Sequence, residues 1–314
     1  MKSSPQGGGW ATHAALLLVQ FAFASQAVEA KIAMLPRREG GEEIFPEALA
    51  MARMLGGALF FQGLAHLWSR TGRPLNGQIV PLARTEHAKL FGLSVLGISL
   101  NQALFLFGLR WTTPFAVSLL GATIPVFAAS LSVLFRKEAF AWRTVLGLLL
   151  ALVGVLSLSG LGHVDHGALL VAMNSLSYAA YVVLSRETVL KIGALRLMAW
   201  VFTYGALAFA PLGLSACVAS MPQWSTRAWV LVAYIVVVPT MLAYYLNAWA
   251  LTRTSATVVT IYIYLQPLLA GLLAHVQLGH DISSRAGVAA AFILLGLGVV
   301  TSRTVLVPRR HRRA

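Results

Sequence analysis

Apolar residues gather in ten long stretches of this chain, and short polar segments separate them. The stretches cover residues 10–29, 47–68, 89–109, 114–135, 141–160, 166–185, 195–218, 227–251, 256–277 and 285–303. Each could cross about 30 Å of hydrocarbon as a helix, which takes about 20 residues. Backbone groups in lipid must be satisfied within the segment, so each stretch is predicted to be helical. The pattern predicts an all-α integral membrane protein with ten transmembrane helices.

Composition leaves no room for a separate aqueous domain. Hydrophobic residues make up 58% of the 314 residues and charged residues 11%, whereas a soluble domain has roughly 25% charged residues. The longest polar connections are residues 30–46 and 69–88. Cys217 is the single cysteine, so an intrachain disulfide is excluded. Any function must therefore lie within the membrane.

The net charge is +14. Its distribution indicates how the chain is oriented in the membrane, because cytoplasmic loops are enriched in Lys and Arg. If the chain crosses the membrane ten times, most of its Lys and Arg residues lie on one side. They are Lys2, Arg70, Arg73, Arg84, Lys89, Arg136, Lys137, Arg143, Arg186, Lys191, Arg196, Arg253, Arg303, Arg309, Arg310, Arg312 and Arg313. The other side holds Lys31, Arg37, Arg38, Arg110, Arg227 and Arg285. This imbalance predicts that both termini lie in the cytoplasm, which agrees with an even number of helices. We expect a multi-pass protein of the bacterial inner membrane. We expect the basic tail, residues 304–314, to contact anionic lipid head groups rather than nucleic acid.

Residues 14–24 leave one alternative open, since they also have the length of a signal-peptide core. A single lysine, Lys2, precedes them, and the apolar run continues to Val28. Cleavage would leave nine helices and would break the alternation of charge between the two sides.

The sequence can be aligned with itself so that Thr112 matches Thr254. This displacement, called the repeat shift below, aligns the fourth and fifth stretches with the ninth and tenth without a gap. Under this repeat shift Pro125 meets Pro267, Arg143 meets Arg285 and Gly154 meets Gly296. Five helices per copy is an odd number, so the second copy must enter the membrane from the opposite side. We therefore expect two inverted five-helix repeats, residues 10–160 and 166–303, with a binding site near the midplane between them.

Several motifs carry a family resemblance over nearly the whole chain. Asn101-Gln102, Phe107 to Thr112, Pro125 and Arg136-Lys137-Glu138 resemble the first half of an EamA-domain protein of the drug/metabolite transporter superfamily. Tyr244 to Leu251, Gln266-Pro267 and Gly296 resemble the second half, and Arg53 matches an arginine common in the second helix. The resemblance implies ten helices in two inverted repeats and export of small metabolites. His280-Asp281 stands where the second half often has a glutamate, which Glu138 provides in the first half.

Polar residues inside apolar spans are costly and usually face the protein interior or a water-filled path. Asn174, Tyr178 and Tyr181 share one helix face, and Tyr262 and Gln266 share another just before Pro267. We predict a substrate-binding cavity, with bonding between helices as the alternative for each residue. The candidates are Arg53, Asn101, Gln102, Asn174, Tyr178, Tyr181, Tyr244, Asn247, Tyr262 and Gln266.

Arg53 is the basic residue placed well inside a span. Its guanidinium could bind a substrate carboxylate. It could also pair with Glu47 or Glu29, or extend toward the membrane surface along its long stem.

The sequence lacks the motifs of nucleotide, metal and acyl-transfer enzymes, so we expect no catalysis and no cofactor. His163, Asp165 and His166 could hold a metal, but Asp165 is better explained as a helix cap. The predicted function is a permease that moves a small polar or amphipathic metabolite, in the export direction, by alternating access. The alternatives are an uptake carrier, a nucleotide-sugar-like exchanger, a membrane-embedded enzyme, or a structural or regulatory membrane protein. The oligomeric state is open, a homo-oligomer included.

Overall fold

The computed structural model describes residues 9–70, 82–158, 166–278 and 285–301, and these residues form helices and connecting turns without any strand. The first half contains α1 (Trp10–Met34), α2 (Pro46–Ser69), α3 (Arg84–Ser94), α4 (Leu100–Trp111), α5 (Pro114–Gly121), α6 (Ile124–Leu134) and α7 (Trp142–Leu158). The second half contains α8 (His166–Ile192), α9 (Ala194–Ser220), α10 (Thr226–Ile235), α11 (Ala243–Leu251), α12 (Ala256–Ile261), α13 (Gln266–Leu278) and α14 (Arg285–Thr301). Short 3-10 turns, η1 (Arg37–Glu39) and η3 (Met221–Gln223), lie in two of the connections.

Within these residues, eight helical spans are long and apolar enough to cross a membrane. Two shorter apolar helices, Trp142–Val153 and Ala291–Val300, lie within α7 and α14. Large apolar side chains are exposed and several polar side chains are buried, which is the reverse of a soluble protein. Leu59, Leu134 and Val276 expose 75%, 71% and 73% of their surface, whereas Arg53 and Gln102 each expose 1%. An apolar exterior around a polar interior is the distribution expected of a helical bundle in lipid.

Four of the long spans are interrupted, and the interruptions correspond between the halves. The span Arg84–Trp111 contains the π-helical turn η2 (Val95–Ser99), and the span Thr226–Leu251 contains the π-helical turn η4 (Val236–Leu242). The repeat shift places Val95 on Val237, inside the second π turn. Pro239 explains the second turn, because its nitrogen has no hydrogen to donate.

The other two interruptions are sharper. Helices α5 and α6 are separated at Ala122 and Thr123, and α12 and α13 are separated by the 3-10 turn η5 (Tyr262–Leu265). The repeat shift places Thr123 on Leu265, the last residue of η5. Pro125 and Gln266-Pro267 then begin the continuing helices, in the first turn where proline is tolerated.

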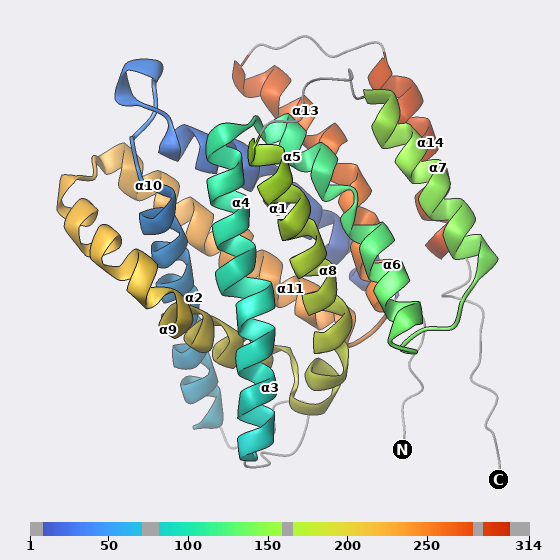
Figure 1. Cartoon of the computed structure of the whole chain (residues 1–314), viewed down its shortest axis with the longest axis horizontal. Helices are drawn as coiled ribbons and strands as arrows, with labels where there is room; N and C mark the ends of the chain where they lie inside the picture. Colours follow the sequence, from blue (N-terminus) through green and yellow to red (C-terminus); the bar gives the residue numbers. More distant parts are fainter. Residues whose placement is uncertain (1–8, 71–81, 159–165, 279–284, 302–314) are drawn as a thin grey trace.

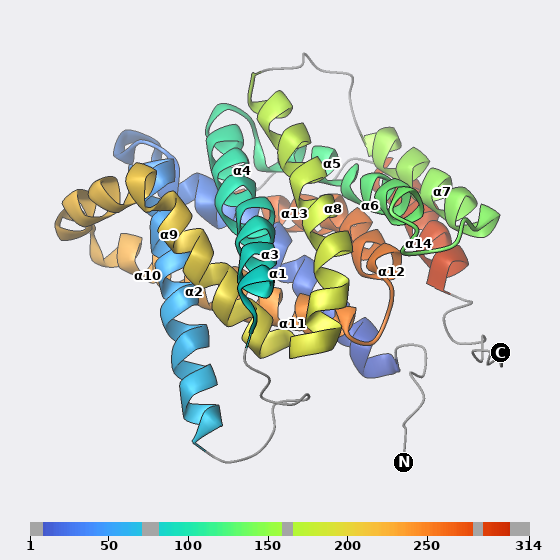
Figure 2. The same cartoon turned by 60° about the horizontal axis from the view of Figure 1, so that its bottom comes forward.

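The helices pack in corresponding pairs. Figure 1 shows α2 and α9 side by side at one edge of the bundle and α7 and α14 side by side at the opposite edge, with α1 and α8 between them. Helix α1 packs on α11 and α13, while α8 packs on α4 and α6. The second view preserves this arrangement (Figure 2).

Helices α7 and α14 run antiparallel and approach closely through glycine. A Cβ atom added to Gly296 would lie 2.4 Å from the carbonyl oxygen of Gly147 and 2.8 Å from the Cβ of Ala151. A Cβ on Gly147 would lie 2.5 Å from Val300 Cγ2. Small residues at such contacts let two backbones pack tightly in lipid. Gly296, which the repeat shift matches with Gly154, is therefore one of the contact residues.

Candidate functional site

The two sharply interrupted spans meet at the middle of the bundle. Helix α5, which ends at Gly121, packs against α13, which begins at Gln266. A Cβ atom added to Gly121 would lie 3.7 Å from Gln266 Oε1. Interrupted helices expose backbone groups that regular helices hide, and binding sites of secondary transporters are built at such places.

A cavity of about 70 Å³ lies at this meeting point. Seven of the ten predicted site residues line it: Arg53, Asn101, Gln102, Asn174, Tyr178, Tyr244 and Gln266. Phe23, Gln26, Phe105, Val117, Gly121, Ile124 and Ile263 complete the lining. The wall therefore draws on both halves of the chain and on both interrupted spans.

Arg53 points into the bundle and not toward the membrane surface. Its Nε donates to Thr240 Oγ1 at 2.9 Å and its Nη2 donates to Gln26 Oε1 at 2.9 Å. Its Nη1 is buried without a hydrogen-bond partner. Among the described residues no carboxylate lies within ion-pair distance of Arg53, so the pairing with Glu47 or Glu29 that the sequence left open is not formed.

Gln102 is the second buried group with unsatisfied polar atoms. Both its Nε2 and its Oε1 are buried without a hydrogen-bond partner, and its side chain lines the cavity. Buried amides in folded proteins are normally bonded, so an amide that is unsatisfied on both atoms calls for an explanation. A polar group in the cavity would satisfy it.

Four further polar residues of the wall, Asn101, Asn174, Tyr178 and Tyr244, bond to one another or to a side chain next to the wall. Asn174 Nδ2 donates to the carbonyl oxygen of Asn101 at 2.7 Å. Tyr244 donates its hydroxyl to Asn101 Oδ1 at 3.3 Å, and Asn247 Nδ2 donates to the hydroxyl of Tyr178 at 2.8 Å. These bonds join α4, α8 and α11. For this part of the wall, the structure combines the two readings that the sequence offered, bonding between helices and lining of the cavity.

Three predicted residues lie outside the main cavity. Tyr181 and Asn247 line a small neighbouring pocket together with Tyr244. The hydroxyl of Tyr262 bonds to Nδ1 of His13. Gln266, which shares the predicted face with Tyr262, lines the cavity and donates from Nε2 to Gln20 Oε1 at 2.8 Å.

Sequence reasoning missed Gln26, Phe23 and Thr240. Gln26 lines the cavity and accepts a hydrogen bond from Arg53, and Thr240 accepts one from the same guanidinium. Gln26 is a polar residue inside the first apolar stretch, which is the signal that could have found it. Phe23 and Thr240 carry no comparable signal, because Phe and Thr are ordinary residues in membrane helices.

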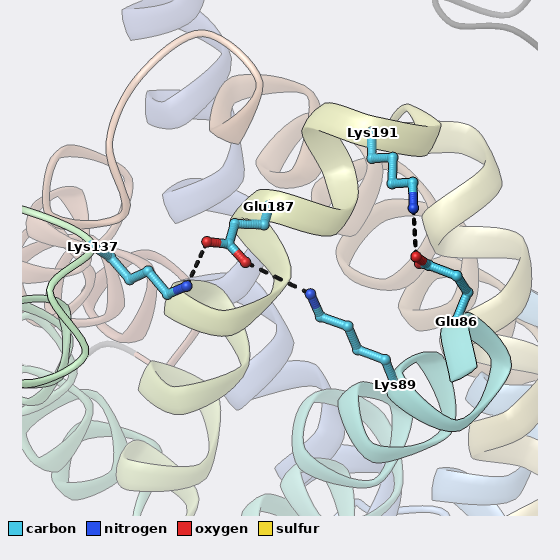
Figure 3. Close-up of polar contacts among 5 residues, drawn as sticks. All are labelled: Glu86, Lys89, Lys137, Glu187 and Lys191. Carbon is cyan, nitrogen blue, oxygen red and sulfur yellow. Dashed lines mark hydrogen bonds and ion pairs between the residues drawn. The ribbon is translucent and has the colours of Figure 1, made fainter. Parts of the chain in front are cut away.

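Polar contacts join neighbouring elements at both ends of the bundle. At one end, Glu187 of α8 pairs with Lys137 in the turn after α6 and with Lys89 of α3, the second pair at 3.7 Å (Figure 3). Glu86 of α3 pairs with Lys191 of α8 beside them. The residues of this cluster belong to the side that the sequence predicts to be richer in Lys and Arg.

At the other end, Lys31 donates from Nζ to the carbonyl oxygens of Leu109, Arg110 and Thr112 at 2.9, 3.1 and 2.8 Å. These carbonyls lie at the C-terminus of α4, where backbone acceptors lack helical partners. The same end holds a pair between Arg227 and Glu42 at 3.7 Å. Lys31 and Arg227, which the sequence assigns to the less basic side, therefore lie at this end.

No group of three His, Cys, Asp or Glu side chains in the described ranges could hold a metal ion. Residues 163 and 165 of the metal alternative fall outside those ranges, as does the basic tail, residues 304–314.

Comparison with known proteins gives a match to the EamA-like transporter family over residues 10–160 and 165–302. The uncharacterized transporter YdfC of Bacillus subtilis is 29% identical over 249 residues, which are 77% of each chain. An uncharacterized transporter of Archaeoglobus fulgidus is 25% identical over 302 residues, covering 93% of this chain and 98% of its own. A WAT1-related protein of Arabidopsis thaliana is 25% identical over 321 residues, covering 91% of this chain and 80% of its own.

Among solved structures, one crystal structure superposes with a TM-score of 0.68 at 18% sequence identity. The match covers 95% of this chain and 98% of the solved chain. At this identity the likeness shows a common fold only.

Proposed function

This chain belongs to the EamA-like transporter family, and on that premise we propose that it is a permease that exports a small polar or amphipathic metabolite by alternating access. Family membership and the transporter names of its relatives make it a multi-pass membrane transporter. The proposal adds the kind of solute, the direction and the mechanism, without a catalytic step.

The mechanism rests on two inverted five-helix repeats, residues 10–160 and 166–303. Three observations support this division. The interruptions of four spans correspond under the repeat shift. Helices α1 and α8 pack on corresponding partners. Helices α7 and α14, which the repeat shift superposes in sequence, run antiparallel, as an inverted repeat requires.

The size of the cavity supports a mechanism that needs helix movement. A volume of about 70 Å³ holds a few water molecules, whereas pockets for small organic ligands measure about 300–1,000 Å³. A metabolite could therefore bind only if the halves separate. The contacts of Glu187 at one end and Lys31 at the other are the bonds that would break as each end opens.

The observation that carries the proposal is the cavity between the halves, with Arg53 and Gln102 presenting unpaired polar atoms to it. The test is transport of a metabolite panel into and out of vesicles that contain the full chain. Tyr178→Phe and Gln266→Ala should lower transport without lowering the amount of protein. Gly63→Ala is a matched control, because a Cβ added there meets no atom within 4 Å. Normal transport per molecule in both cavity variants would contradict the proposal.

We place the protein in the bacterial inner membrane with both termini in the cytoplasm. The end that carries Glu187, Lys137 and Lys89 would then be the cytoplasmic end. A reporter fused after Ala314 should report the cytoplasm, and one inserted near Gly40 should report the outside. The reverse result would remove the orientation and with it the direction of export.

A further inference from the structure

The charge of Arg53 is not balanced within the described part of the protein. Arg53 exposes 1% of its surface, and no residue of the cavity wall is acidic. Glu47 lies on the same helix, but it forms no ion pair with Arg53, and its Oε2 has no hydrogen-bond partner. An uncompensated cation away from water is strongly unfavourable, so an anion inside the cavity would be strongly attracted to it.

Two neutral acceptors fix the direction of the guanidinium. Thr240 takes the Nε hydrogen and Gln26 takes one Nη2 hydrogen. The group is therefore held rigidly before any ligand arrives, which lowers the entropy that binding must overcome. The two hydrogens of Nη1 are left without an acceptor at the cavity wall. A carboxylate is the acceptor that matches arginine in both charge and geometry.

One arginine balances one negative charge. A doubly charged group such as a phosphate monoester would leave a net negative charge among Phe23, Phe105 and Ile263. The observations therefore favour a monoanion.

Gln102 adds a second requirement. Its unpaired Nε2 donates and its unpaired Oε1 accepts. A hydroxyl group can accept from the first atom or donate to the second, whereas a plain hydrocarbon would leave both atoms unsatisfied. The aromatic side chains of Phe23, Phe105 and Tyr244 complete the wall and suit an apolar body.

We propose that the cavity binds a small monocarboxylate with an apolar body and a hydroxyl group, its carboxylate on Arg53 Nη1 and its hydroxyl on Gln102. This substrate class rests on the proposed permease function. Arg53 selects the charge, and Gln102 selects the hydroxyl.

The test uses the purified full chain and three probes of similar shape at pH 8: 4-hydroxybenzoate, its neutral amide 4-hydroxybenzamide, and benzoate. Equilibrium binding of the wild type should favour 4-hydroxybenzoate over the amide by about tenfold or more, the factor that a hydrogen bond to a charged group supplies. Arg53→Gln should abolish this preference and Arg53→Lys should keep part of it. Gln102→Leu should abolish the preference for 4-hydroxybenzoate over benzoate and leave the preference over the amide intact.

Arg38→Gln is the matched control, because Arg38 has a side chain that is 84% exposed in the connection between α1 and α2. It should bind all three probes as the wild type does. The thermal unfolding midpoint of each variant identifies any loss of binding that follows from unfolding. If Arg53→Gln proves to be unfolded, binding of the probes by Gln102→Leu and Arg53→Lys still tests the proposal. A wild type that binds none of the probes, or that binds the amide as tightly as the acid, would overturn the proposal.

Transport in vesicles separates this proposal from the permease proposal. A solute that Arg53→Gln carries as fast as the wild type would overturn the carboxylate site and leave the permease intact. Binding of 4-hydroxybenzoate that depends on Arg53, in a protein that moves no solute of the panel, would overturn the permease and leave the site intact.

Discussion

Arg53 of α2 donates from Nε to the hydroxyl oxygen of Thr240 at 2.9 Å, and Thr240 donates in turn to the carbonyl oxygen of Ile235 at 2.8 Å. Thr240 lies in the π-helical turn η4 next to Pro239. The bond therefore joins the buried guanidinium to the irregular part of the span Thr226–Leu251. The position of Arg53 and the shape of that turn depend on each other.

Replacing Thr240 tests this dependence. Thr240→Val keeps the shape of the side chain but removes the acceptor, which leaves Arg53 Nε without a partner in a buried site. We expect a loss of about 1–3 kcal/mol in the free energy of unfolding. Thr240→Ser retains the hydroxyl and should lose less. Thermal unfolding in detergent measures both, and equal losses in the two variants would show that the methyl group matters more than the bond.

The contact of α7 with α14 gives a prediction with a control on the same helix. Gly296→Ala would place a Cβ 2.4 Å from the carbonyl oxygen of Gly147, so the helices must separate, and we expect a loss of about 1–3 kcal/mol. Gly298→Ala meets nothing within 4 Å and should be neutral or slightly stabilising, because alanine favours helix over glycine. The unfolding midpoints of the two variants check this. A stable Gly296→Ala variant would contradict the close packing.

The cluster around Glu187 should affect transport more than stability. Its pairs with Lys137 and Lys89 are partly exposed, since the carboxylate side chain exposes 56% of its surface. Exposed pairs contribute about 0–1 kcal/mol, so Glu187→Gln should unfold almost as the wild type does.

The same pairs join α3, α8 and the turn after α6, so they should resist opening of this end. We expect the initial transport rate of the wild type to rise with salt, which screens exposed charges, and the rate of Glu187→Gln to depend less on salt. Glu39→Gln, which breaks the exposed pair of Arg38 in the connection after α1, is the control. Equal salt dependence in all three proteins would exclude a role in gating.

Transport should not require a proton. Proton-driven carriers commonly titrate a carboxylate inside the membrane, and the wall of this cavity contains neither an acidic residue nor a histidine. Exchange of labelled against unlabelled solute across vesicles should therefore continue at the same rate when a protonophore removes the pH gradient. Uphill accumulation driven by a pH gradient would refute this, and Glu29 and His13 would then be the first residues to replace.

In the described part of the chain, eight of the ten predicted stretches hold a helix that is long and apolar enough to span a membrane, because lipid selects apolar residues over the full length of a span. The other two, 141–160 and 285–303, hold the shorter apolar helices Trp142–Val153 and Ala291–Val300. Boundaries were less accurate where a helix continues beyond the apolar part. Helix α3 begins at Arg84 and α8 extends to Ile192, several residues past the predicted limits 89 and 185. These extensions contain Glu86, Glu187 and Lys191. Glu86 pairs with Lys191 between α3 and α8, and Glu187 pairs with Lys137 in the turn after α6.

The lining of the cavity was predictable where a polar residue interrupts an apolar helix, as at Arg53, Gln102 and Asn174. The pairing of Tyr262 with Gln266 assumed a regular α-helix, in which residues four apart share a face. The 3-10 turn η5 covers Tyr262–Leu265 and turns more steeply per residue, so the two side chains diverge. The π turn Val95–Ser99 contains no proline, so the sequence contains no sign of it. Its Gly97 lies against the ring of Tyr181, and this contact is visible only in the folded chain.

The repeat shift places Gln102 on Tyr244, and both side chains line the cavity. Corresponding positions of the two halves thus present different chemistry to the same space, while the breaks in the helices coincide. A solute in the proposed site would meet an amide from one half and a phenol from the other, so we expect it to bind better in one orientation than when turned end to end. A mutation in the cavity lining of one half can therefore change specificity, while the helix interruptions that both halves share stay the same.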